Sequence, residues 1–455
     1  MITMRNVFTC IQVHFWFAAT ALVCVTAARA ATTSPGESRF SVLRGSTAYR
    51  IALAPHAGNN KCDEQIRKSQ EAVRQAVDPR PQLERLGWLY VAKARASHDP
   101  GFYSLAEQCA LALDTGDSNN CAALLLRGHV AQSFHRFKDA EIIARQLIAQ
   151  RELAFDHGLL GDSLADQGNL VEAIGEYQRM IDLRPDLQSY SRVAHVRWLK
   201  GDLSGAIEAA ELAVNSASPA DAESAAWACT RLASYSFQAG EKFNAESSCK
   251  AALDFVGDYP PALLLRGRMF LSDGKPVEAA EVIRRAAAAN PLPEYQWALA
   301  EALREAGKIE EANNVEAEIK RSGVANDPRT CSLFLATRGE QASVALRLAE
   351  RELECRHDIF THDALAWALL AAGRCSDAWA AMQHALAEGT KDARLFLHAG
   401  AIAARLGRGD AEAWLSRARE LERLLLPSEQ GLLQESLRLS TRTRASGSGL
   451  RADAL

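Results

Sequence analysis

Five residues with metal-binding side chains lie close together between positions 355 and 363. Cys355, His357, Asp358, His362 and Asp363 offer sulfur, nitrogen and oxygen donors at short spacing, which could bind a transition-metal ion. The same residue types also cap helices and line polar turns, and some of these side chains would then point away from the others. We therefore expect no metal here. A metal-dependent protein that uses Cys355, His357 and His362 is the alternative.

The cysteines suggest structure rather than chemistry. The chain contains ten cysteines and no Cys-x-x-Cys motif. Cys229 and Cys249 each lie one helical turn from a small residue, Ala233 and Ala245, and these two alanines should face each other across a helical hairpin. A disulfide between Cys229 and Cys249 is then geometrically reasonable. Two buried thiols are the alternative.

Sequence motifs that carry catalysis are missing. The chain has no phosphate-binding Gly-Lys-Ser/Thr loop, no His-Glu-x-x-His and no Gly-x-Ser-x-Gly. Paired acids such as Glu310 and Glu311 fit the solvated face of a helix. The formal net charge of -4 gives no reason to expect nucleic acid, because phosphate binding needs a basic surface. We expect a non-enzymatic protein without a cofactor.

The elements that position these residues are set by an internal repeat. Six stretches share one spacing, in which a small residue is followed by Gly seven positions later and by Ala five positions after that. The leading small residues are Gly161, Ala194, Ala233, Gly267, Ala300 and Ala366, at intervals of 33, 39, 34, 33 and 66. The small residues let two helices approach closely, and the Gly ends the first helix. The pattern predicts an all-α solenoid of antiparallel helix pairs.

Two stretches carry a resemblance to a known family. Gly158 to Ala173, with Tyr177 and Pro185 after it, resembles the tetratricopeptide repeat, and so does Leu263 to Pro291. The resemblance covers residues 81–425, about ten repeats, with weaker copies that lack the helix-ending Gly. It implies a right-handed superhelical solenoid whose concave groove is lined by the first helix of each pair. It implies little about function, because the fold hosts many partners.

The resemblance also places a row of side chains on the groove face, where a partner would bind. The positions around each leading small residue give Trp88, His129, Asp162, His195, Trp198, Trp227, Phe237, Arg268, Trp297, Arg304 and Trp367. Trp and Arg are the residue types that dominate binding hot spots. The row lacks the Lys and Asn with which some tetratricopeptide domains grip a C-terminal carboxylate. An extended peptide with apolar side chains, or a polysaccharide stacked on tryptophans, fits better; packing between helices is the alternative for each tryptophan.

The N-terminus predicts export. An apolar stretch follows Arg5 and ends in Ala28-Arg29-Ala30, which is typical of a secretory signal peptide, residues 1–30, cleaved after Ala30. An uncleaved membrane anchor is the alternative. The protein is then expected in the periplasm of a bacterium or outside the cell, and a membrane contact is expected only if the signal stays uncleaved.

The segments that flank the repeats differ in composition. Residues 31–60 are rich in Ser, Thr, Gly and Pro and predict a flexible leader, 61–80 a capping helix, and 426–455 a partly disordered tail. These features together predict a protein–protein interaction scaffold of the cell envelope with an unknown protein or peptide partner. A structural subunit that self-assembles through a poorly capped C-terminal end is a further alternative.

Overall fold

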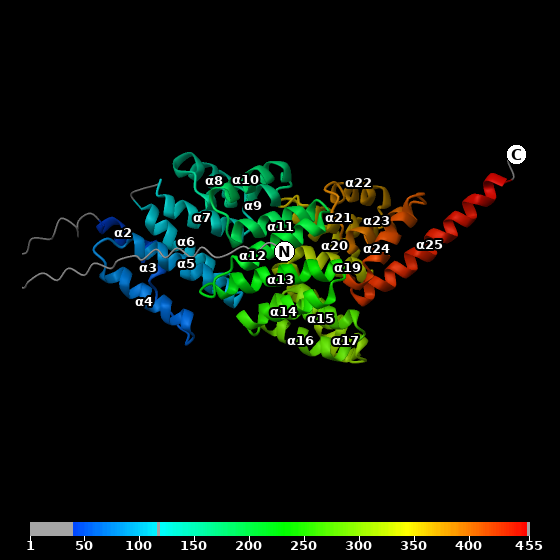
Figure 1. Ribbon diagram of the computed structural model, residues 1–455, viewed down its shortest axis with the longest axis horizontal. Helices are drawn as coiled ribbons and strands as arrows, with labels where there is room; N and C mark the ends of the chain where they lie inside the picture. The colour runs from blue at the N-terminus through cyan, green and yellow to red at the C-terminus, as the bar shows by residue number, and fades with distance from the viewer. Residues whose placement is uncertain (1–39, 116–118, 453–455) are drawn as a thin grey trace, which may run out of the picture.

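The described part of the chain is built from paired helices. The computed structural model describes residues 40–115 and 119–452, and every regular element there is a helix (Figure 1). Ten antiparallel pairs follow one another: α5 (Arg80–Ser97) with α6 (Gly101–Asp114), α7 (Cys121–Ser133) with α8 (Phe137–Arg151), α9 (Ala154–Asp166) with α10 (Leu170–Leu183), α11 (Leu187–Leu199) with α12 (Leu203–Asn215), α13 (Ala222–Ala239) with α14 (Lys242–Phe255), α15 (Pro260–Ser272) with α16 (Pro276–Ala289), α17 (Pro293–Glu305) with α18 (Ile309–Asn326), α19 (Pro328–Arg338) with α20 (Ala342–Leu353), α21 (Ile359–Ala371) with α22 (Cys375–Ala385), and α23 (Ala393–Arg405) with α24 (Ala411–Glu420). The predicted tetratricopeptide-type solenoid of about ten pairs is confirmed.

Each hairpin turn needs one residue in the left-handed region of backbone space. Glycine takes this conformation without a Cβ penalty, and Gly168, Gly201 and Gly240 have φ of 83°, 74° and 82°. The first two pairs lack a glycine there, and His98 and His135 adopt the same conformation with φ of 55° and 57°. The predicted role of the recurring glycine as the end of the first helix is confirmed.

Small residues let the two helices of a pair touch, as the repeat spacing predicts. A Cβ on Gly161 would lie 2.5 Å from Cε1 of Tyr177, and one on Gly267 would lie 2.2 Å from Cγ1 of Ile283. The partner side chains therefore already fill the space that a larger residue would need. Apolar side chains from successive pairs form shared core clusters, so that no pair buries its apolar face alone.

The N-terminal end is more ordered than the sequence predicts. Part of the expected flexible leader forms α2 (Ser41–Gly45) and α3 (Thr47–Ala52), and α4 (Lys61–Gln75) follows as the expected capping helix. Leu43 is buried, and Tyr90 of α5 donates a hydrogen bond to the carbonyl of buried Ala52 at 2.8 Å. The leader prediction is wrong for residues 40–53, because their apolar side chains cover the first pair. The predicted signal peptide lies outside the described residues.

The C-terminal end is covered by a long helix, α25 (Pro427–Ala452), which follows the short 3-10 helix η1 (Glu422–Leu424). Leu433 of α25 is fully buried in one cluster with Phe396 and Leu415 of the last pair. The start of the segment predicted as a partly disordered tail is therefore an ordered helix packed against the last pair. The poorly capped end on which the self-assembly alternative depended is covered by this helix.

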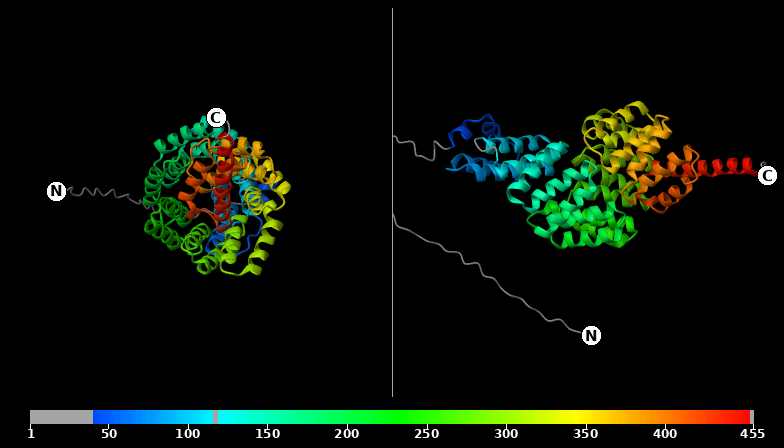
Figure 2. Two further views of the ribbon diagram at one scale, coloured as in Figure 1. Left: turned by 90° about the vertical axis from the view of Figure 1, so that its right-hand side faces the viewer. Right: turned by 90° about the horizontal axis from the view of Figure 1, so that it is seen from above.

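The solenoid curls so far that its last pairs lie inside the turn formed by the middle pairs. Figure 2 shows the C-terminal helices within a ring of other helices when the molecule is viewed along its long axis. Phe360 of α21 stacks on Trp198 of α11 with ring centroids 5.9 Å apart, and Thr390 donates a hydrogen bond to the Leu199 carbonyl at 2.5 Å. The groove is therefore not open along its whole length.

Candidate functional site

This closure divides the concave face into two parts. We call the surface over α5, α7, α9 and the start of α11 the outer groove, and the surface over α13, α15 and α17 the inner groove. Of the predicted groove residues, Trp88, His129 and Asp162 line one outer-groove cavity of about 470 Å³. Phe237 and Arg268 line an inner-groove cavity of about 240 Å³, which residues of the C-terminal pairs enclose.

The outer groove presents an apolar wall. Trp88 of α5 is partly buried and packs against His129 of α7, with ring centroids 5.5 Å apart. Phe155 of α9 is 44% exposed, and Leu125 and Leu159 complete the wall. Aromatic and aliphatic side chains gathered in one concavity are typical of a site that takes an apolar side chain of a ligand.

Three charged residues of the outer groove, Asp162, Arg192 and Arg95, are paired with protein groups. Arg192 of α11 donates two hydrogen bonds to the Asp162 carboxylate, from Nε at 2.8 Å and from Nη2 at 2.5 Å. The Tyr177 hydroxyl donates a third at 3.0 Å. Arg95 forms an ion pair with Glu223 at 2.5 Å. These charges compensate one another, so the site does not require a charged ligand.

His129 adds no charge to this wall at neutral pH. Burial, with the positive charges of Arg95 and Arg192, lowers the pKa of His129 to about 4. The imidazole is therefore neutral between pH 5 and 8, the range in which an unperturbed histidine would titrate. Its neutral ring extends the surface of Trp88.

The middle of the predicted row is covered by the chain itself. His195 stacks on Trp198 with ring centroids 5.7 Å apart, and Trp198 Nε1 donates a hydrogen bond to Gln238 Oε1 at 2.8 Å. Trp198 also stacks on Phe360 of α21. Trp198 is therefore covered by α21 in this structure, whereas His195 lines a cavity of about 460 Å³ together with Asp162 and His362.

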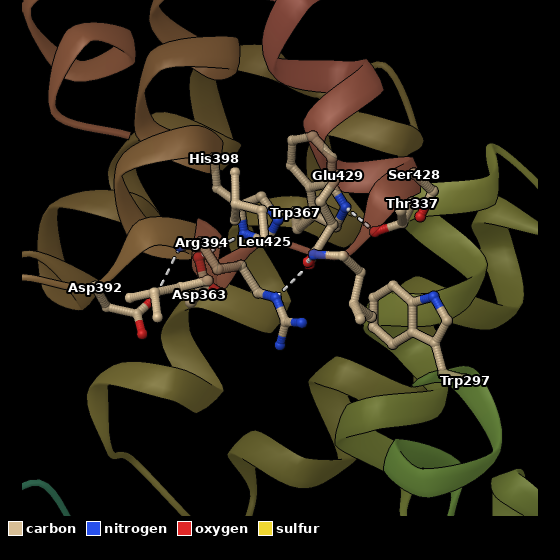
Figure 3. A network of polar contacts seen from close by, with 12 residues as sticks. Trp297, Thr337, Asp363, Trp367, Asp392, Arg394, His398, Leu425, Ser428 and Glu429 are labelled. Atoms are coloured by element: carbon tan, nitrogen blue, oxygen red, sulfur yellow. Dashed lines mark hydrogen bonds and ion pairs between the residues drawn. The ribbon is translucent and has the colours of Figure 1, made fainter. Parts of the chain in front are cut away.

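Two predicted tryptophans are packing residues rather than exposed anchors. Trp297 is 1% exposed, and its Nε1 donates a hydrogen bond to buried Glu301 at 3.0 Å. Trp367 is 5% exposed, stacks on His398 at 3.9 Å and donates to Thr337 Oγ1 at 3.0 Å (Figure 3). The packing alternative holds for both, since a buried indole N–H needs a partner and has found one within the protein.

The two remaining residues of the predicted row, Trp227 and Arg304, also contact other parts of the protein. Trp227 of α13 is partly buried against core clusters that contain Tyr259 and Ala213. Arg304 of α17 forms an ion pair with Glu316 of α18 at 2.9 Å. Neither residue lines the outer groove.

The possible metal ligands at 355–363 are held apart by separate structural roles. Asp358 caps α21, and the buried pair of Asp363 Oδ1 and His398 Nδ1 is hydrogen-bonded at 2.8 Å. His362 stacks on His384 with ring centroids 5.0 Å apart. Within residues 40–115 and 119–452, no three His, Cys, Asp or Glu side chains are grouped as a metal site. The metal alternative has no support in this arrangement.

The predicted disulfide is not formed. All eight cysteines of the described residues are free thiols, although Cys229 and Cys249 lie in one core cluster with Ala233 and Ala245. Cys249 donates from Sγ to the Ala262 carbonyl at 3.3 Å, and burial raises the pKa of Cys249 to about 11. The arrangement is that of the alternative, two small buried thiols.

Sequence reasoning missed Phe155 and Gln188, which both line the outer-groove cavity. The groove positions were sought within about one helical turn of each leading small residue. Phe155 and Gln188 lie seven positions before the predicted groove residues Asp162 and His195. At 100° per residue a spacing of seven returns to the same side of the helix, so a search over two turns finds both.

Comparisons with known proteins concern the fold. No protein-family profile and no curated protein matches the sequence. Yeast Tom70 is similar in structure with 13% identity, over 86% of this chain and 93% of that chain, at a TM-score of 0.37. The human IFIT1 dimer with PPP-AAAA is similar with 12% identity, over 79% and 96%, at 0.42. A tetratricopeptide repeat protein from Parabacteroides merdae is similar with 17% identity, over 56% and 98%, at 0.31.

Proposed function

We propose that the protein is a non-enzymatic interaction scaffold whose outer groove binds an extended segment of a partner protein. The observation that supports this most is the cavity of about 470 Å³, with Trp88, Phe155 and two leucines on one wall. A cavity of this size accommodates one or two large apolar side chains of a peptide that crosses the pairs. Main-chain groups of that peptide would meet polar rim residues such as Gln132 and Gln188.

The polar pairing favours a peptide over the polysaccharide. Carbohydrate recognition needs hydrogen-bonding groups beside a stacking ring. In the outer groove Arg192 donates to the Asp162 carboxylate, and Arg95 forms an ion pair with Glu223. Much of the remaining lining is apolar and suits burial of a ligand side chain from water, namely Trp88, Leu125, Phe155 and Leu159.

The binding prediction is tested with peptides selected on the full-length protein from a random library. We expect the selected sequences to be enriched in aromatic and aliphatic residues. Trp88→Ala and Phe155→Ala are each expected to weaken binding about tenfold or more, because truncating an anchor in a groove costs about 2 kcal/mol. The measurement is the dissociation constant from fluorescence anisotropy.

Phe243→Ala is the matched control, because Phe243 is an aromatic side chain on α14, outside the groove, and 81% exposed. It is expected to leave the affinity unchanged. Equal losses for Trp88→Ala and Phe243→Ala, or none for either groove variant, would contradict the assignment of the site.

We further propose that the protein is exported and works in the cell envelope. The support is the apolar stretch at the N-terminus, followed by Ala28-Arg29-Ala30. In the described part of the chain, no helix combines the length and apolar character needed to cross a bilayer. N-terminal sequencing of the protein from a native envelope fraction is expected to begin at Ala31. An intact N-terminus in the membrane fraction would support the anchor instead.

A further inference from the structure

A short segment of the chain crosses the inner groove. Residues 423–429 run from the end of η1 through Leu425 and Leu426 into the first turn of α25, and Leu425 has an extended backbone with φ of -81° and ψ of 146°. The sequence of this segment is Arg-Leu-Leu-Leu-Pro-Ser-Glu. We call it the cis segment.

Side chains and backbone of the inner groove hold the first half of the cis segment. Arg423 donates from Nε to the Phe237 carbonyl at 3.1 Å and from Nη2 to the Gln238 carbonyl, both at the C-terminal end of α13. Arg268 of α15 donates from Nη2 to the Leu424 carbonyl at 3.0 Å. The contacts are those by which a groove binds an extended peptide, with the groove recognising a ligand backbone carbonyl and a basic side chain.

The leucines of the cis segment fill apolar positions of the same groove. Leu424 packs against the cluster that contains Phe237 and Leu265. Leu426 is 4% exposed and lies in the cluster that contains Leu264 and Trp297. Two predicted groove residues, Phe237 and Trp297, therefore share core clusters and cavity linings with leucines of a segment that belongs to this chain.

The second half of the cis segment ends in polar contacts. Ser428 donates to the Glu301 carboxylate from its backbone N–H at 3.0 Å and from its hydroxyl at 2.6 Å. Glu429 pairs with Arg394 at 2.5 Å, beside Trp297 (Figure 3). Hydrogen bonds of Arg423 thus lie before the leucines, and the polar contacts of Ser428 and Glu429 lie after them. These contacts fix the direction of the segment across the groove.

The cis segment does not fill the inner groove. Cavities of about 240 and 140 Å³ remain beside it, and Arg268, Phe360 and Arg394 line both. A permanently closed protein core is packed more tightly than this. Open space therefore remains beside the groove residues that contact the segment.

We propose that the inner groove is a second peptide-binding site and that the cis segment is its internal, displaceable ligand. The partner that it fits is a protein segment with a basic residue, two or three consecutive leucines and then a hydroxyl and an acidic residue, which adopts the same course as residues 423–429, extended at Leu425 and helical after it. Such a partner competes with the cis segment and releases the start of α25. This inference goes beyond the proposed function, which concerns the outer groove.

The test uses a fluorescein-labelled synthetic peptide of residues 420–431 and full-length protein. The double variant Arg423→Ala, Leu424→Ala removes contacts between the cis segment and the inner groove. We expect it to bind the peptide at least tenfold more tightly than the wild type does. Addition of Arg268→Ala is expected to abolish that gain. A peptide with the substitution Leu424→Asp is expected not to bind.

Trp88→Ala separates this inference from the proposed function, because it changes the outer groove alone. In the double variant it is expected to leave binding of the 420–431 peptide unchanged. Circular dichroism shows whether the double variant retains its helices. If it does and its affinity for the peptide equals that of the wild type, the inference is wrong.

Wild-type protein provides a second measurement that needs no destabilising change. A large excess of the 420–431 peptide is expected to speed hydrogen exchange of the Leu426 and Ser428 amides, which the Glu429 and Glu301 carboxylates protect in the closed form. Unchanged exchange at saturating peptide would overturn displacement. The Leu424→Asp peptide provides the matched control.

Discussion

Replacing Arg394 by Met is expected to detach the start of α25 and to cost about 2–4 kcal/mol of unfolding free energy. Glu429 is 1% exposed, and its main ionic partner is Arg394 at 2.5 Å. Without the guanidinium a buried carboxylate loses its compensating charge, which is costly in a medium of low polarity. The Arg394 side chain is 28% exposed, so the expected loss is below that for a fully buried pair.

The effect of Arg394→Met should depend on pH in a defined direction. Burial alone would raise the pKa of Glu429, but the charge and hydrogen bond of Arg394 and the Leu426 N–H hold it below its ordinary value. In the wild type, Glu429 therefore adds stability above its unfolded pKa, and this is lost as the pH falls through the folded pKa. In the variant, burial dominates and raises the pKa, so the penalty is present at neutral pH and falls as Glu429 takes up a proton. The difference between the two proteins should shrink from pH 7 to pH 4.

Urea denaturation at several pH values measures this difference, and Arg285→Met is the matched control. Arg285 pairs with Asp258 on the surface, with side chains 56% and 71% exposed. Exposed pairs contribute about 0–1 kcal/mol, so this control should be close to the wild type at every pH. Equal losses for the two variants would contradict the role assigned to Glu429.

Replacing Gly267 by Leu is expected to cost about 1–3 kcal/mol through overpacking. A Cβ at this position would lie 2.2 Å from Cγ1 and 2.6 Å from Cδ1 of Ile283, which is fully buried. The added side chain can be accommodated only if α15 and α16 separate, and that opens their shared core. The measurement is the midpoint of thermal unfolding followed by circular dichroism.

Gly175→Leu is the control for this variant, because the substitution is identical and the surroundings differ. Gly175 lies within α10, is exposed, and a Cβ there would meet nothing within 4 Å. Since Leu is the better helix former by nearly 1 kcal/mol, this protein is expected to be slightly more stable than the wild type. Loss of stability in both variants would mean that leucine, rather than the packing at Gly267, is responsible.

The fold could be predicted from the sequence because the recurring residues of the repeat make their contacts within one helix pair. The glycine that ends the first helix and the small residue that meets its neighbour are set by contacts within a pair, as at Gly161 and Tyr177. A fixed spacing of such residues therefore predicts the number of pairs and their register. The weak copies of the repeat form the same hairpin, and in one of them His135 adopts the backbone conformation of the recurring glycine.

The open part of the groove could not be predicted in the same way. Whether Trp198 faces solvent depends on the small rotation from each pair to the next, summed over ten pairs. That sum brings Phe360 onto Trp198 and Leu424 onto Arg268, and each pair of residues is more than 150 positions apart. No spacing within one repeat contains this information. Trp88 of the first pair lines the outer-groove cavity, and within residues 40–115 and 119–452 no residue of the C-terminal pairs is part of that lining.

Because the cis segment lies near the C-terminus, the inner groove is synthesised before the segment that occupies it. The helices of the inner groove leave the ribosome before residues 423–429 do, and domains tend to fold from the N-terminal side as they emerge. For that interval Phe237, Leu265 and Arg268 have no occupant, and the nascent chain exposes an apolar surface. Chaperones that shield such surfaces, or other unfinished chains, then compete for it until the final helices arrive.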